Sequence, residues 1–159
     1  DVVSMNIAKR HIIFDIGNYS IISRLLDGEF LDYNAAIPKS LTTEVRVNAK
    51  MFINSIERTS LLITDRLKSP LRCVFDENLI RISTVTSLGT ANDRLYAQTE
   101  GNRVEIGFNN RFLLDALRAC DIEEVKITLN GPLSPITIVP PEGDNFLFLV
   151  LPVRLKNEN

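Results

Sequence analysis

From residue 43 onward, the spacing of the apolar residues changes from the period of a strand to that of a helix and back again, and this order occurs twice. Alternating runs predict strands at residues 44–47 and 103–107, and each runs into an amphipathic helix. Three more strands are expected after each helix, at 71–75, 79–85 and 94–98 in the first half and at 125–129, 136–139 and 146–153 in the second, with a loop at 87–92. The pattern predicts an α+β fold in which a unit of one strand, one helix and three strands is used twice.

The two expected helices carry matching features. Asn48 is a suitable N-cap for the first helix, and either Asn109 or Asn110 suits the second. The apolar stripes that follow at helical spacing are Ala49, Phe52, Ile53 and Ile56, then Phe112, Leu113, Ala116 and Leu117. At an offset of 60 residues, Phe52 aligns with Phe112, Ile53 with Leu113 and Arg58 with Arg118. This agreement indicates an internal duplication.

The closing strand does not alternate, because every residue from Phe146 to Leu151 is apolar. Both of its faces therefore need apolar cover, either from the core or from a partner. The run predicts a core strand or a docking surface.

Residues 1–38 do not fit the repeat. Residues 10–16 and 20–26 predict a hairpin that turns at Gly17 and Asn18. A lone hairpin is barely stable in water, so this piece is expected to complete a domain whose remainder is absent. The chain also begins without methionine in strand-like sequence, which suggests a truncated or processed product.

Composition narrows the function. The 159 residues are 45% hydrophobic, carry a net charge of −2 and suffice for one domain and a piece of another. No apolar run approaches the ~18 residues of a membrane span, and no secretory signal opens the chain, so a cytoplasmic location without membrane contact is expected. Cys73 and Cys120 lie in apolar surroundings and are expected to be reduced and buried. No metal or other cofactor is expected.

Catalytic residues are scarce. His11 is the sole histidine and lies in an apolar strand, which favours a packed or rim residue over a general base. Glu123 and Glu124 are most simply a solvated turn, and no glycine-rich phosphate loop is present. The chain is not expected to be an enzyme.

Cations recur on the polar faces of both helices, at Lys50, Arg58, Arg111 and Arg118, with Arg66 and Lys68 just after the first helix. Cations two helical turns apart can follow a phosphate backbone. The alternative is a solvated face with internal contacts such as Arg111–Asp115 and Asn54–Arg58. No aromatic residue is interleaved to stack on bases, so only duplex contact without sequence preference is expected.

Four motifs occur in order along the chain: LDGEFLDY at 26–33 with Ile37 and Pro38, VEIGFN at 104–109 with FLLDAL at 112–117, NGP at 130–132, and VLPVRL at 150–155. Together they resemble the C-terminal part of the bacterial sliding clamp, the beta subunit of DNA polymerase III. The resemblance implies a DNA-clamp fold, with residues 1–38 as the end of the middle domain and its linker, 39–155 as the third domain and 156–159 as a tail.

The resemblance also implies a function. The full-length protein would be a homodimeric ring around double-stranded DNA, which tethers DNA polymerase, the clamp loader and repair proteins through their short peptide motifs. The residues facing DNA would be Lys50, Arg58, Arg66, Lys68, Arg111 and Arg118. The subunit interface would use Leu61 and Leu62, which follow the first helix, and the edge segment 90–95 with Arg94 and Leu95.

The peptide cleft of the family lies between its second and third domains. Mapped by motif, the share of this chain would be Leu31, Ala36, Asn109, Phe112, Leu133, Pro135, Leu149, Val150, Leu151, Pro152, Val153 and Arg154. The chain departs from the family at Leu31, Ala35, Ala36 and Pro135, where polar or bulkier residues are common, which affects specificity. The alternative is a free-standing α+β interaction module without a link to DNA, whose closing strand is core or a generic peptide groove.

Overall fold

The computed structural model describes residues 2–64 and 69–155 and divides the chain into two compact units, Asp1–Asp32 and Tyr33–Asn159. This division falls before the domain boundary expected at residue 38, so the short helix α1 (Tyr33–Ala36) belongs to the second unit. Within the described residues, no helix is long and apolar enough to span a membrane.

The first unit is a three-stranded antiparallel sheet. Its strands are β1 (Ser4–Ile7), β2 (His11–Ile16) and β3 (Tyr19–Arg24), in that order across the sheet. The expected hairpin is confirmed, and Gly17 supplies the positive φ of 58° that its turn requires. The strand register puts one set of apolar side chains on a single face: Met5, Ile7, Ile12, Phe14, Ile16, Tyr19 and Ile21.

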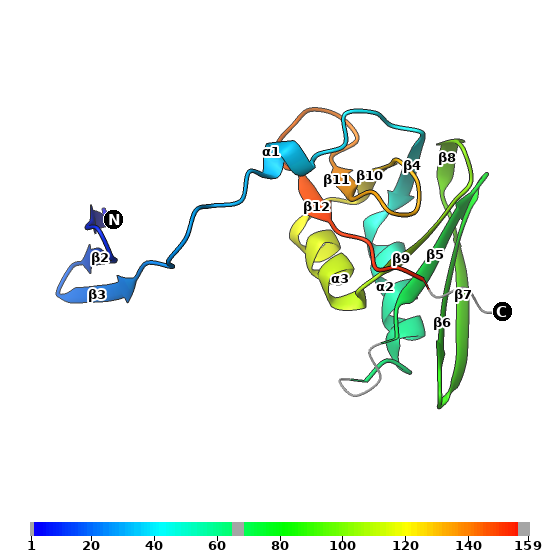
Figure 1. Cartoon of the computed structure of the whole chain (residues 1–159), viewed down its shortest axis with the longest axis horizontal. Helices are drawn as coiled ribbons and strands as arrows, with labels where there is room; N and C mark the ends of the chain where they lie inside the picture. The colour runs from blue at the N-terminus through cyan, green and yellow to red at the C-terminus, as the bar shows by residue number, and fades with distance from the viewer. Residues whose placement is uncertain (1, 65–68, 156–159) are drawn as a thin grey trace. The chain divides into compact units, whose positions relative to one another are not determined.

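The second unit holds two sheets and two long helices (Figure 1). One sheet has the order β12-β11-β10-β4-β8 and the other β7-β6-β5-β9. The elements are β4 (Thr43–Asn48), α2 (Ala49–Ser60), β5 (Leu71–Asp76), β6 (Leu79–Thr86), β7 (Gly89–Tyr96), β8 (Gln98–Gly101), β9 (Val104–Phe108), α3 (Asn110–Ala119), β10 (Glu124–Leu129), β11 (Ile136–Val139) and β12 (Phe148–Val150). Helices α2 and α3 lie side by side, α2 against β5, β6 and β7 and α3 against β12.

The two halves exchange their first strands. Strand β4 of the first half pairs with β10 of the second, and β9 of the second pairs with β5 of the first. Each sheet therefore contains strands from both halves, and the apolar side chains of both meet in one core. The duplication expected from the sequence describes the order of elements, but neither half has a sheet of its own.

The expected alignment of the halves is wrong by one residue. Asn48 caps α2 and Asn109 caps α3, so equivalent positions are 61 residues apart rather than 60. Phe52 then corresponds to Leu113, and both are fully buried, whereas Phe112 is 63% exposed. The N-cap fixes the phase of a helix, which is why the choice of Asn109 over Asn110 moves Phe112 out of the core.

The third strand of each half crosses from one sheet to the other. The strand expected at 94–98 is in fact β7 and β8, which lie in different sheets on either side of the buried Ala97. The strand expected at 146–153 is shortened to β12, and its pairing ends before Pro152, which has no N–H to donate. Val153 pairs instead with the other sheet, where its N–H donates to the Gly107 carbonyl over 2.7 Å.

The loop expected at 87–92 is also wrong. Strand β7 already begins at Gly89 and pairs with β6 along its whole length. The Thr86 hydroxyl closes the turn by accepting a hydrogen bond from the Leu88 N–H over 3.1 Å. A tight turn closed by a side chain lets pairing resume within two residues of the end of β6.

The expected burial of both cysteines is confirmed, because Cys73 and Cys120 lie in the core. Burial raises the pKa of the Cys73 thiol, and it raises the pKa of the Cys120 thiol to about 11.

Gly107→Ala should destabilise the second unit. A Cβ at this position would lie 2.5 Å from the Val153 carbonyl oxygen and 2.7 Å from Leu155 Cδ2, so the crossing segment must shift. Overpacking of this kind lowers the free energy of unfolding by about 1–3 kcal/mol. Urea denaturation measures the loss, with Glu142→Ala in an exposed loop as control. Equal midpoints for the wild type and Gly107→Ala would disprove the close approach.

Both thiols should resist alkylation in the folded protein at neutral pH. A raised pKa leaves little thiolate, which is the reactive form, and the reaction of Cys120 should accelerate as the pH rises toward about 11. Mass spectrometry after iodoacetamide treatment checks this, with guanidinium-unfolded protein as the control. Rapid labelling of the folded chain at neutral pH would contradict it.

Candidate partner groove and cationic helix face

A hollow of about 570 Å³ lies between α3 and the end of β12. Its lining combines apolar side chains with one carboxylate: Asn109, Phe112, Asp115, Ala116, Phe148, Leu149, Val150, Leu151, Pro152 and Val153. Most of these side chains are apolar. Between the end of β12 and Val153, the chain around Pro152 pairs with no strand. The hollow can therefore accept apolar side chains of an extended segment.

Local sequence explains the shape of this hollow. The Asn109 side chain accepts a hydrogen bond from the Arg111 N–H over 3.0 Å and caps α3, which begins at Asn110 and has Phe112 as its third residue. Phe112 consequently stands on the surface of α3 instead of its buried stripe. Phe148, which also lines the hollow, packs against Phe146 with ring centroids 5.3 Å apart.

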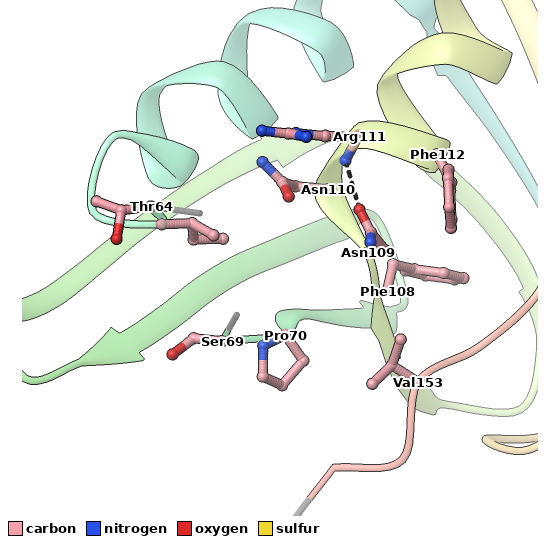
Figure 2. A pocket seen from close by; sticks show the side chains of 10 residues that line it. Thr64, Ser69, Pro70, Phe108, Asn109, Asn110, Arg111, Phe112 and Val153 are labelled. Carbon is pink, nitrogen blue, oxygen red and sulfur yellow. Dashed lines mark hydrogen bonds between the residues drawn. The ribbon is translucent and has the colours of Figure 1, made fainter. Parts of the chain in front are cut away.

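A second hollow, of about 560 Å³, shares three residues with the first, Asn109, Phe112 and Val153. Figure 2 shows Phe112 and Arg111 on the first turn of α3, with Ser69 and Pro70 across the hollow. Its other lining residues are Ile63, Thr64, Phe108 and Asn110. The second hollow is more polar than the first because hydroxyl and amide side chains line it.

The first hollow brings together seven residues that the sequence assigned to the cleft: Asn109, Phe112, Leu149, Val150, Leu151, Pro152 and Val153. Four more lie in the second unit but line neither hollow, namely Ala36, Leu133, Pro135 and Arg154. Leu31 belongs to the first unit, so its role stays a prediction.

Sequence reasoning missed three residues of this hollow, Asp115, Ala116 and Phe148. Helical spacing carried a signal for two of them, because Asp115 and Ala116 follow Phe112 at i+3 and i+4. Strand alternation carried a signal for Phe148, which shares a face with Val150.

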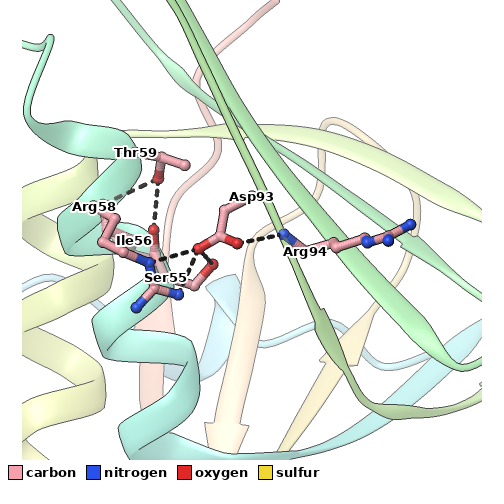
Figure 3. Close-up of polar contacts among 6 residues, drawn as sticks. All are labelled: Ser55, Ile56, Arg58, Thr59, Asp93 and Arg94. Atoms are coloured by element: carbon pink, nitrogen blue, oxygen red, sulfur yellow. Dashed lines mark hydrogen bonds and ion pairs between the residues drawn. The ribbon is translucent and has the colours of Figure 1, made fainter.

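Two of the cations expected on the helix faces hold carboxylates of this chain. The Arg58 guanidinium donates to Asp93 Oδ2 from Nε over 2.9 Å and from its terminal nitrogen over 2.6 Å (Figure 3). The Arg118 guanidinium donates to Glu57 Oε1 over 2.7 Å and joins α3 to α2. Internal ion pairs were the alternative to DNA contact, but the partner of Arg58 is Asp93, not Asn54. Lys50 and Arg111 are exposed, and Arg66 and Lys68 lie outside the described residues.

Asp93 is a charged residue that points inward from β7, an edge strand. Burial alone would raise the pKa of its carboxyl, but hydrogen bonds from Ser55, Arg58 and the Arg94 N–H outweigh burial and lower the pKa below the usual 3.8. Because the folded pKa is the lower one, the ionised carboxylate stabilises the fold at neutral pH. That contribution is lost as the pH falls through the folded pKa.

The residues expected at a subunit interface are not equally accessible. Leu61, at the end of α2, is 80% exposed, Leu62 is half-buried and Arg94 is exposed. Leu95 is only 6% exposed and belongs to the core, because its side chain points from β7 toward α2. Leu95 can therefore support an interface from beneath but offers little surface.

A metal site and the sole histidine were the remaining candidates for chemistry within residues 2–64 and 69–155. No group of three or more His, Cys, Asp or Glu side chains in these ranges could hold a metal ion. His11 lies exposed at the start of β2 in the first unit.

The family model described as "DNA polymerase III beta subunit, C-terminal domain" matches residues 34–154. The beta sliding clamp of Staphylococcus epidermidis is 30% identical over 149 residues, which cover 92% of this chain and 40% of that protein. The chain thus spans about 40% of the length of the curated relatives it matches.

Solved structures agree with this match. The DNA polymerase sliding clamp from Bacillus subtilis superposes with a TM-score of 0.87 at 30% identity, covering 97% of this chain and 41% of that one. The sliding clamp from Bartonella birtlesii, bound to griselimycin, gives a TM-score of 0.87 at 27% identity and covers 96% of this chain and 41% of that one. The resemblance and the DNA-clamp fold expected from the sequence are confirmed, and the chain belongs to the family of DNA polymerase III beta subunits, the sliding clamps.

Proposed function

We propose that this chain is the C-terminal part of a DNA polymerase processivity factor, which tethers replication and repair proteins to DNA and catalyses no reaction itself. The observation that supports this best is the groove between α3 and residues 148–153, which gathers seven of the residues that the resemblance assigns to a peptide cleft. A replication role would place the protein in the cytoplasm. No observation favours the alternative of an interaction module unrelated to DNA.

The groove suits a short extended peptide with apolar side chains. Phe112 is the large exposed aromatic on one side, and Leu151 and Pro152 form the other. Aromatic side chains of this kind carry much of the binding free energy at protein interfaces. The griselimycin-bound clamp from Bartonella birtlesii indicates that a member of the family accepts a ligand. The remaining wall would come from the domain that precedes the third one in the full-length clamp.

Residues 1–38 would be the end of that preceding domain and the linker that follows it. The apolar face of the first sheet supports this, because seven apolar side chains on one side of three strands need cover that the sheet does not provide. Further strands and a helix of the same domain, contributed by preceding sequence, would supply it. Residues 39–155 would then be the third domain of the clamp.

The full-length protein would close into a homodimeric ring around duplex DNA, with α2 and α3 facing the hole. Lys50, Arg58, Arg111 and Arg118 on these helices would attract phosphates without reading bases. Arg66 and Lys68 would add to this charge. The ring contact would use the edge strand β7 with Arg94, and the exposed Leu61 with Leu62.

Phe112→Ala should weaken peptide binding without unfolding the chain. The side chain is largely exposed, so its removal leaves no cavity in the core, but the peptide loses an aromatic contact and should bind about tenfold more weakly. NMR titration with a clamp-binding peptide of a bacterial polymerase should shift the resonances of residues 149–154 in the wild type. Leu61→Ala, another exposed apolar side chain, is the matched control. Unperturbed resonances in the wild type at high peptide concentration would refute the cleft.

Arg118→Glu should reduce retention on immobilised duplex DNA at low salt. Arg81→Glu is a matched control, since both arginines pair with a carboxylate and have side chains 54% and 53% exposed, but Arg81 lies on the opposite face of its sheet from α2. Both variants change the net charge equally, so only position distinguishes them. Elution by a salt gradient should come earlier for Arg118→Glu alone. Equal elution of the two variants would reject the helix face as the DNA contact.

A further inference from the structure

Glu57 and Arg118 occupy equivalent positions in the two halves. With equivalent residues 61 apart, residue 57 of α2 corresponds to residue 118 of α3, and the two side chains meet over 2.7 Å. A cation at both positions would place like charges against each other at the seam between the helices. A carboxylate at one of them instead makes the seam an ion pair.

The exposure of this ion pair allows another anion to replace the Glu57 carboxylate. The Arg118 side chain is 54% exposed and the Glu57 side chain 46% exposed, so water and salt reach both charges. Exposed ion pairs contribute little to stability and weaken as salt rises. An incoming phosphate can therefore replace the Glu57 carboxylate, but it must compete with it.

The second arginine of the face is held differently. Arg58 bonds to Asp93, which also accepts a hydrogen bond from the Ser55 hydroxyl over 2.8 Å and is 23% exposed (Figure 3). Asp93 thereby joins its own strand β7 to α2, so its carboxylate supports the fold as well as pairing with Arg58. Glu57 has no hydrogen bond other than that from Arg118 among the residues the structure describes, so its carboxylate serves the ion pair alone.

We propose that Glu57 limits the affinity of the helix face for DNA by competing with phosphates for Arg118. This rests on the proposed function, in which α2 and α3 face duplex DNA. Glu57 acts through Arg118 and is a positioning residue, which need not touch DNA. Its effect is to keep the contact of Arg118 with the phosphate backbone weak and readily exchanged, as movement along DNA requires.

The test is the salt dependence of retention of the whole chain on immobilised duplex DNA. Glu57→Gln keeps the size of the side chain and should raise retention about two- to fivefold at low salt, because the competing charge is gone. The slope of log retention against log salt should steepen by up to about 0.9, the value for one more phosphate neutralised. Glu142→Gln makes the same change of net charge in an exposed loop and should alter neither.

A double variant separates the ion pair from a general charge effect. In an Arg118→Gln background, Glu57→Gln should no longer raise retention, because the side chain for which it competes is absent. If Glu57→Gln matches Glu142→Gln, or raises retention equally with and without Arg118, the competition is refuted while the DNA face stands. If the wild type is not retained at low salt, or Arg118→Glu elutes with Arg81→Glu, the DNA face fails and the inference fails with it.

Discussion

The crossing of the chain between sheets at the end of each half is the constraint on which the second unit depends. Strands β7 and β8 make one crossing around Ala97, and residues 150–153 make the other. The two crossings are equivalent. After the first crossing Gln98 pairs with Arg46, and after the second Val153 pairs with Gly107, which lies 61 residues after Arg46. Together with the exchange of β4 and β9, these crossings leave each half without a sheet of its own, so one core forms from both.

The groove follows from the second crossing. Once the chain leaves β12 after Val150, Leu151 and Pro152 lie between two sheets and beside α3, where neither sheet covers them. The absence of a side chain at Gly107 lets Val153 approach closely enough to end the crossing. The ambiguity of the closing apolar run is thereby resolved in two parts: Val150 is buried, whereas Leu151 is exposed beside Phe112.

The charges of α2 and α3 show how a duplicated scaffold can carry unequal functions. The same offset that makes Phe52 and Leu113 equivalent buried residues of the core makes Glu57 and Arg118 equivalent on the surface, where their side chains meet. Asp93 adds a second carboxylate to the face from the edge of the sheet, where an inward-pointing charge also opposes further strand pairing. The face is thus less cationic than its arginines suggest, which fits the proposed role of a surface that would touch DNA without holding it.

The sequence by itself determined most element types, the cap of α2, the burial of the cysteines and the segment that forms one side of the groove. These depend on periodicity and on contacts within a few residues, which any stretch of chain reveals. Sheet membership, the one-residue offset between the halves, the exposure of Phe112 and the partners of Arg58 and Arg118 were decided only by the tertiary structure. Sheet membership and the partners of Arg58 and Arg118 depend on pairings between residues far apart in the sequence, such as Arg58 with Asp93 and Glu57 with Arg118, which local patterns do not encode. The offset and the exposure of Phe112 depend on which of two adjacent asparagines, Asn109 or Asn110, caps α3, and the local sequence suits both.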